Sequence, residues 1–204
     1  MHRSAPSAPQ NRRAFARLAA LISAAAASLW LTGCALPPVN RDGDVALTTA
    51  KSVDLDRYLG RWYEIARFPN WFEEGCVDVT ATYSLKENGD IKVENACVKP
   101  SGPDVAVGRA KIVDPETNAK LRVAFFGPFF APYWILDVAP DYSLALVGEP
   151  RGRFLWILAR EPALTEAQKD DALAKLDALG YRTDELYWTP QSAANSAAAS
   201  EEKN

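Results

Sequence analysis

Gly60-Arg61-Trp62-Tyr63-Glu64-Ile65-Ala66-Arg67 is the stretch of sequence that decides the fold. A glycine that permits a tight bend comes before a large aromatic residue and a strand, as where a strand enters the closed end of a small barrel. Much later, residues 154–160 form an almost wholly apolar strand that ends in Arg160. Its guanidinium can stack on an indole and reach backbone carbonyls. We therefore predict a barrel whose floor is built by Gly60, Trp62 and Arg160 as structural residues.

Residues 1–33 have the features of an export signal. Arg12, Arg13 and Arg17 precede an uncharged apolar run over residues 18–30, which matches a basic segment followed by a short hydrophobic one. The run is short for a bilayer span, so a membrane-spanning helix is the weaker interpretation. The following Leu-Thr-Gly-Cys resembles the bacterial lipobox, which implies that Cys34 is lipidated and becomes the mature N-terminus.

A lipid on Cys34 implies attachment to a membrane. Ala35 follows this cysteine, and similarity to sorted lipoproteins without aspartate at that position favours the outer membrane, on its periplasmic side. The pair Arg12-Arg13 also resembles a twin-arginine signal, so the general and the twin-arginine export routes both stay open.

The mature chain is acidic and contains no histidine. Residues 1–33 hold four of the 23 basic residues, no acidic residue and the single histidine, so the remainder has 19 basic and 26 acidic residues, a net charge of −7. This charge argues against nucleic acid and anionic membrane surfaces as electrostatic partners. Loss of His2 removes the commonest general base and metal ligand. We predict no catalytic residue, no metal site and no cofactor.

Cys76 and Cys97 remain as a pair after lipidation of Cys34. In an oxidising compartment a disulfide between them is the expected outcome, and two buried free thiols are the alternative. The two cysteines have opposite parity in their predicted hairpin. A disulfide therefore requires Cys76 to lie before the regular strand, or a bulge to shift the register.

Composition divides the mature chain into three parts. Residues 34–52 contain a Pro-Pro pair and few large apolar side chains, which predicts a tether between the lipid and the domain. Residues 191–204 are rich in alanine and serine without aromatic residues, which predicts a disordered tail. Residues 53–190 have the length of one domain.

The domain is predicted to consist of short strands. Alternating residues 77–85 lead through Asn88-Gly89 into residues 91–95, the strongest short-range signal of a β-hairpin. Together with the strand at Trp62, this makes eight strands at regular spacing, an all-β fold of the eight-stranded antiparallel up-and-down barrel type. The remaining strands are predicted over residues 105–113, 121–126, 133–138, 144–147 and 154–160.

One helix is predicted after the strands, packed on the outside of the barrel. Thr165 and Gln168 have the spacing of a capping box, and Gly180 can end the helix. A last extended piece, residues 185–189, is expected to pair with a sheet edge. The apolar face of the helix consists of Ala172, Leu173, Leu176 and Leu179.

The domain resembles a lipocalin. The resemblance rests on Gly60-x-Trp62, on Arg160 at the end of the last strand, and on several ordered segments, including Phe-Phe-Gly-Pro-Phe and Leu-Trp-Ile-Leu-Ala-Arg-Glu-Pro. Within the family it is similar to the bacterial outer-membrane lipocalins and to apolipoprotein D. The family's middle Thr-Asp-Tyr motif is reduced here to Asp141-Tyr142. The resemblance implies a cup that binds a small hydrophobic molecule, in this branch a fatty acid or a lysophospholipid.

Alternation with period two predicts which side chains face the cup. Leu85 is placed on the same inward face as Tyr83, and Ala81, Gly108 and Ala110 are small inward residues that leave volume. A barrel of this size can instead have a filled core, and that alternative stays open. The resemblance adds Tyr133 to the inward residues. The predicted ligand-binding residues are Val79, Ala81, Tyr83, Val93, Asn95, Val123, Phe125, Tyr133, Trp156 and Leu158.

Residues 68–72 and 126–132 are two aromatic segments in predicted loops, which the resemblance places at the mouth. Exposed aromatic side chains there suggest ligand capture, membrane contact or association with a second copy, and loops folded down as a lid are the alternative. The leading hypothesis is storage or transport of small lipophilic molecules. A lipid-modifying enzyme, known among lipocalins, and an envelope scaffold that docks through this rim are the competing hypotheses.

Overall fold

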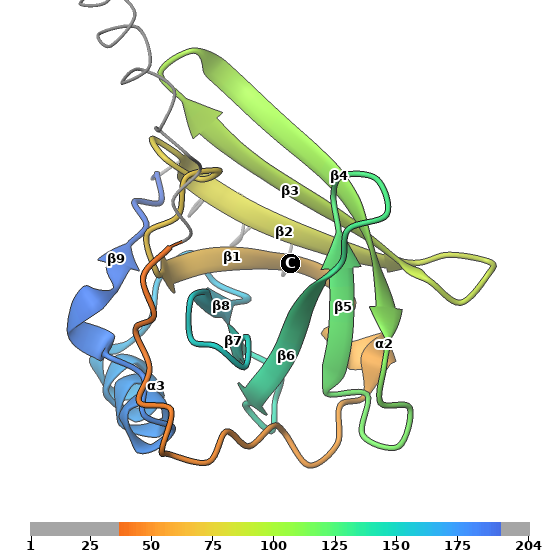
Figure 1. The fold of residues 1–204 in the computed structure, drawn as a ribbon. Helices are drawn as coiled ribbons and strands as arrows, with labels where there is room; N and C mark the ends of the chain where they lie inside the picture. The colour runs from red at the N-terminus through yellow and green to blue at the C-terminus, as the bar shows by residue number, and fades with distance from the viewer. Residues whose placement is uncertain (1–36, 193–204) are drawn as a thin grey trace, which may run out of the picture. The chain divides into compact units, whose positions relative to one another are not determined.

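The computed structural model describes residues 37–192 and confirms the predicted barrel and helix (Figure 1). The export signal, Cys34 and residues 193–204 lie outside the described residues. Strand boundaries differ from the predicted ones by a few residues, and the third strand is longer than expected. The strands are β1 (Gly60–Arg67), β2 (Val77–Leu85), β3 (Ile91–Lys99), β4 (Gly102–Ile112), β5 (Lys120–Ala124), β6 (Ala131–Val138), β7 (Leu144–Gly148), β8 (Leu155–Ala159) and β9 (Tyr187–Trp188).

The sheet closes because β1 pairs with both β8 and β2, while the other strands pair in chain order. All these pairings are antiparallel, as short hairpin connections require. β5 pairs with residues 109–112 of β4, whereas β3 pairs with residues 102–110. The outer part of the β3–β4 hairpin therefore extends beyond β5 (Figure 1), while β3 stays paired with β2 as far as Val98.

The core has two parts, one inside the barrel and one outside it. The inner cluster includes Trp62, Val93 and Leu158, and the outer cluster includes Ile65, Leu146 and Ile157. Alternate residues of the same strands thus serve different clusters, as the pleat of a strand requires. The predicted sheet alternation explains this division.

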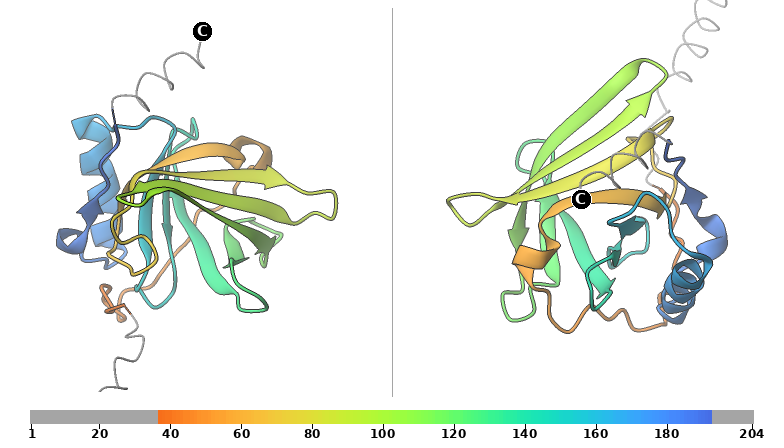
Figure 2. Two further views of the ribbon diagram at one scale, coloured as in Figure 1. Left: turned by 90° about the horizontal axis from the view of Figure 1, so that it is seen from above. Right: turned by 180° about the vertical axis from the view of Figure 1, so that it is seen from behind.

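Helix α3 (Glu166–Ala178) covers the outer cluster, and Figure 2 shows it beside the barrel. Thr165 caps it, and the capping box with Gln168 is complete. Ala172 and Leu176 are buried against the outer cluster, while Leu173 and Leu179 pack beside them. The predicted helix, its cap and its apolar face are confirmed.

The end of the described chain fills a gap between β1 and β2. Direct pairing of these strands stops at Tyr63 and Thr80, and beyond that point β9 pairs with β1. The side-chain amide of Gln191 then donates to the backbone oxygens of Glu64 and Val79. Strand pairing of residues 185–189 is thus confirmed for Tyr187–Trp188, and residues 191–192, predicted to begin a disordered tail, are docked instead.

Residues 37–52, predicted to belong to a tether, instead lie along the barrel. The Asn40 amide donates to the oxygen of Gly152, and the Ala50 amide donates to the oxygen of Ile135. Arg41 pairs with Tyr181 and donates to the oxygen of Leu179. Composition did not reveal this docking because it depends on backbone hydrogen bonds, which residues of any type can form.

Two short helices complete the fold, α2 (Leu55–Tyr58) and the 3-10 helix η2 (Thr183–Glu185). The sequence pattern did not predict α2, although Asp54 caps it by accepting a hydrogen bond from the Arg57 amide. Within residues 37–192, no helix has the length and apolar character needed to cross a membrane.

A disulfide joins Cys76 and Cys97, whose Cα atoms are 5.5 Å apart. This confirms the predicted pairing. The structure accommodates the opposite parity of the two cysteines in both of the ways that the sequence analysis named. Cys76 precedes β2, and the β2–β3 register shifts between Val77 and Thr80. Asp78, inside this irregular stretch, has a φ of 53°.

Candidate functional site

The predicted ligand-binding residues lie mainly in the inner cluster. Four are buried in it and four others pack against it in partly buried positions. Val79 is also buried, whereas Asn95 is partly exposed. Leu85, placed on the inward face by alternation, is exposed instead, because it ends β2 beside the turn at Asn88. The buried four are Ala81, Tyr83, Val93 and Leu158, and the partly buried four are Val123, Phe125, Tyr133 and Trp156.

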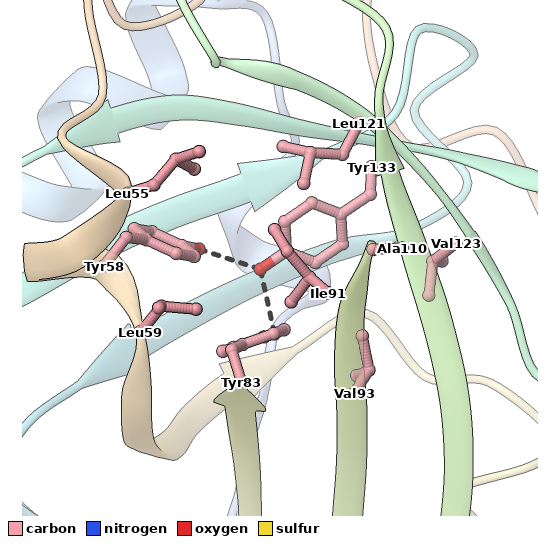
Figure 3. Close-up of a pocket in the computed structure, with 10 residues that line it drawn as sticks. All are labelled: Leu55, Tyr58, Leu59, Tyr83, Ile91, Val93, Ala110, Leu121, Val123 and Tyr133. Carbon is pink, nitrogen blue, oxygen red and sulfur yellow. Dashed lines mark hydrogen bonds between the residues drawn. The ribbon is translucent and has the colours of Figure 1, made fainter. Parts of the chain in front are cut away.

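A cavity of about 10 Å³ lies near the closed end of the barrel (Figure 3). This is about the space that one water molecule occupies. Four predicted residues line it, namely Tyr83, Val93, Val123 and Tyr133, while the other six do not. The remaining lining residues are Leu55, Tyr58, Leu59, Ile91, Ala110 and Leu121.

Three of those lining residues come from α2 or directly follow it, and sequence reasoning missed all three. Leu55 and Tyr58 belong to the helix, and Leu59 comes next in the chain. The available signal was Asp54, a helix N-cap residue, in front of apolar residues with helical spacing. The one-turn helix lies at the closed end of the barrel and contributes side chains to the cavity.

Three phenol groups meet at this cavity. The Tyr133 hydroxyl is 2.8 Å from the Tyr58 hydroxyl and 2.9 Å from the Tyr83 hydroxyl, and Figure 3 shows the three pointing toward one another. Burial raises the pKa of Tyr83 to about 12 and holds the pKa values of Tyr58 and Tyr133 well above 10. All three are therefore neutral hydroxyl groups at physiological pH.

The floor of the barrel is the contact between Trp62 and Arg160. The Arg160 guanidinium carbon lies 3.8 Å from the centre of the Trp62 ring. Its Nη atoms donate to the backbone oxygens of four residues at distances from 2.6 to 3.3 Å. The Trp62 Nε1 donates to the Tyr58 oxygen at 2.8 Å. The four acceptor residues are Arg57, Tyr58, Leu59 and Arg61.

Gly108 does not leave free volume in the barrel, contrary to the prediction. A Cβ atom built on it would lie 2.8 Å from both the Ala124 oxygen and a ring carbon of Phe125. The Phe125 ring therefore occupies the room that the missing side chain provides. Ala110, by contrast, does line the cavity.

The mouth end of the interior holds a buried charged group of side chains, the acid cluster, formed by Glu64, Arg67, Asn70, Glu73 and Thr189. All five are buried. Arg67 Nη1 lies 3.4 Å from Glu64 Oε1, and Arg67 Nε lies 3.4 Å from Glu73 Oε2. Asn70 also bonds to Glu73, and Thr189 to Glu64.

Two carboxylates share one cation in the acid cluster. Burial, followed by the nearby charge of Glu73, raises the pKa of Glu64 well above its ordinary value of 4.5. Trp156 Nε1 contacts Glu73 Oε2 at 3.3 Å and links the cluster to the interior. The arrangement therefore favours a proton held by Glu64 while Arg67 balances Glu73.

The aromatic loops are only partly exposed. Phe126 is 74% exposed, Phe129 80% and Trp71 68%. Phe68, predicted in the same exposed group, is buried in the outer cluster against Tyr181. Both loops lie at the mouth end of the barrel, because they connect β1 with β2 and β5 with β6.

Neither histidine nor a free cysteine is present in the part of the chain that the structure describes, residues 37–192. The two cysteines in it are joined to each other. Among these residues, no group of three or more histidine, cysteine, aspartate or glutamate side chains is arranged to hold a metal ion.

Comparison with known proteins agrees with this architecture. A family model described as a lipocalin-like domain matches residues 53–191. The outer membrane lipoprotein Blc of Escherichia coli is 37% identical over 180 residues, covering 86% of this chain and 98% of Blc. Rat apolipoprotein D is 42% identical over 148 residues, covering 67% of this chain and 71% of its own. The structure of insecticyanin from Manduca sexta superposes with a TM-score of 0.60 at 22% identity, covering 74% and 87%.

Proposed function

This chain belongs to the lipocalin family, and we propose that it binds a small hydrophobic molecule inside its barrel. The observation that carries the proposal is the closed barrel with an apolar inner cluster around a cavity. Burial of an acyl chain there contributes about 0.8 kcal/mol for each methylene group. A chain of ordinary length therefore supplies micromolar affinity after the costs of association.

The cavity must enlarge before it accepts such a ligand. Its volume of about 10 Å³ suits one small group. Phe125 and Trp156 are partly buried aromatic residues at the interior that take no part in the hydrogen bonds among the tyrosines, and they can swing outward at lower cost than fully buried ones. We propose that the space for the ligand opens when these side chains move. Fatty acids or lysophospholipids are the proposed ligand class.

We place the protein at the outer membrane, on the periplasmic side, with a lipid on Cys34 as its anchor. The sequence motif at Cys34 and the outer membrane lipoprotein Blc of E. coli support this location. In cells fed with labelled palmitate, the wild-type chain should carry the label in the outer membrane fraction. The Cys34→Ser variant should lack it, and labelling of that variant would contradict the proposal.

The binding proposal is tested with protein purified from its own envelope without detergent. Native mass spectrometry should show a bound lipid, and added lipids should quench tryptophan fluorescence. Trp156→Phe should remove much of the quenching, because Trp156 packs against the inner cluster, whereas Trp71→Phe at the exposed loop should not. Absence of bound lipid together with absence of quenching would contradict the proposal.

Docking through the aromatic rim is a second candidate function, favoured by the exposure of Trp71, Phe126 and Phe129. Substitutions Trp71→Ser and Phe129→Ser should then abolish binding of a partner or a second copy while lipid affinity stays unchanged. A thiol-dependent enzyme could not use Cys76 or Cys97 as its nucleophile, because these two cysteines form a disulfide.

A further inference from the structure

The three tyrosines at the cavity have more protons than they use. Each phenol can donate one hydrogen bond, and the group Tyr58, Tyr83 and Tyr133 forms two hydrogen bonds. Within residues 37–192 these hydroxyls have no other hydrogen-bond partner. Whichever way the hydrogens are arranged, one of the three protons is therefore unused.

The unused donor faces an apolar space. The seven other residues that line the cavity have aliphatic side chains, and Tyr58 and Tyr83 are buried. A hydroxyl donor in such surroundings gains from any acceptor that reaches it, since nothing else there competes for its proton. The volume of about 10 Å³ admits one small polar group.

The missing acceptor is an uncharged one. No cationic side chain lines the cavity, and Arg160 directs its Nη atoms to four backbone oxygens. An ionised carboxylate would be buried here without a cation. A carbonyl oxygen needs only the one donor that the phenols offer.

We propose that the three tyrosines form a subsite for an uncharged carbonyl oxygen at the deepest point of the ligand site. The ligand then enters with this oxygen first, and its hydrocarbon part lies along Val93, Val123 and Phe125. The inference rests on the proposed function, since it requires a hydrophobic ligand in the barrel. It narrows the hydrophobic ligand to an apolar molecule with a ketone, ester or similar carbonyl at its buried end, in preference to an ionised fatty acid that enters with its carboxylate first.

Three probes of one shape test the proposal. The ketone 4-phenylbutan-2-one, the hydrocarbon butylbenzene and the anion 3-phenylpropanoate differ only in the group that would meet the phenols. Their affinities are measured by displacement of the neutral fluorophore N-phenyl-1-naphthylamine. The ratio of ketone to hydrocarbon affinity is compared between the wild type and the variant Tyr58→Phe/Tyr83→Phe/Tyr133→Phe, because each single variant still keeps at least one unused proton.

The ratio should fall about tenfold in the triple variant, the usual effect of one hydrogen bond. In the wild type, 3-phenylpropanoate should bind at least about tenfold more weakly than the ketone. Tyr63→Phe is the matched control, because the Tyr63 hydroxyl is buried in the outer cluster without a hydrogen-bond partner in the described chain. This control should leave the ratio unchanged.

Infrared spectroscopy supplies a readout that does not depend on the folding of the variant. The carbonyl stretch of 4-phenylbutan-2-one, labelled with carbon-13 at its carbonyl, should shift to lower frequency in the wild-type complex than in alkane solvent. A frequency equal to that in alkane solvent would overturn the inference. An equal affinity ratio in wild type and triple variant would overturn it while leaving the proposed function intact. Failure of all three probes to bind the wild type would overturn both.

Discussion

Arg160 at the floor and Arg67 at the mouth end are balanced in different ways. Arg160 donates to neutral backbone oxygens and stacks on Trp62, whereas Arg67 lies between the carboxyl groups of Glu64 and Glu73. Because the three phenols beside the floor keep one unused proton, that end has a hydrogen-bond donor in excess, and the mouth end has acidic groups in excess. The two ends of a bound ligand therefore meet different groups, a hydrogen-bond donor at the floor and acidic side chains at the mouth end. Four predictions test this difference.

Trp62→Ala should have the largest effect, because it removes a fully buried indole and the surface on which Arg160 stacks. We expect the free energy of unfolding to fall by about 4 kcal/mol in urea titrations. The control Trp71→Ala should change it by no more than about 0.5 kcal/mol, since Trp71 is exposed. Equal losses in both variants would show that Trp62 does not anchor the floor.

Arg67→Met should lower the free energy of unfolding by about 3 kcal/mol, because two buried carboxyl groups lose their cation. The same urea titrations measure it at neutral pH. Adding Glu73→Gln to this variant should restore part of the loss by removing the carboxylate that Arg67 balances. A further loss in the double variant would contradict the charge balance described for the acid cluster.

The pH dependence of stability should distinguish the mouth end from the floor. The pKa of Glu64 is raised in the folded protein, so the folded state holds a proton that the unfolded chain releases above its ordinary pKa of about 4.5. The stabilising contribution is complete below that pH and is lost as the pH rises toward the raised value, by up to about 1.4 kcal/mol per pH unit.

Unfolding of Glu64→Gln at several pH values checks this prediction. The stability of the wild type relative to the variant should decline with rising pH, while Glu116→Gln, at an exposed glutamate, should follow the wild type. Parallel curves for wild type and Glu64→Gln would mean that Glu64 does not hold the proton.

Tyr83→Phe should have the smallest effect, a loss of about 1 kcal/mol for its hydrogen bond to Tyr133. Tyr63→Phe should cost nothing measurable by thermal or urea unfolding, because its hydroxyl has no hydrogen-bond partner among residues 37–192. If the two substitutions cost the same, the phenol group would be a packing feature without a role for its hydroxyls.

Much of this architecture follows from local patterns. The hairpin at Asn88-Gly89, the capping box at Thr165 and the alternation around Trp62 each depend on neighbouring residues, so the strands and the helix were predictable. The bonds from Arg160 to the floor required only that two distant strands meet, which the family resemblance implied.

The site was predicted less completely, because its parts come together only in three dimensions. Tyr58 lies on a one-turn helix that the sequence marks only by its N-cap residue Asp54 and one turn of apolar spacing. The filling of space beside Gly108 by Phe125 depends on the packing of two strands. Glu64 and Glu73 join the same cluster through a loop whose path alternation does not describe.

The segment that fills the gap between β1 and β2 also orders the events of folding. Thr189 and Glu64 contact each other across 125 residues of sequence, and ribosomes make chains from the N-terminus onward. A nascent chain that ends before β9 would present the unfilled edges of two strands, which can template the pairing of other chains. Sealing of the wall is thus expected to be a late, long-range step, and a chain truncated before Tyr187 is expected to aggregate more readily than the full chain.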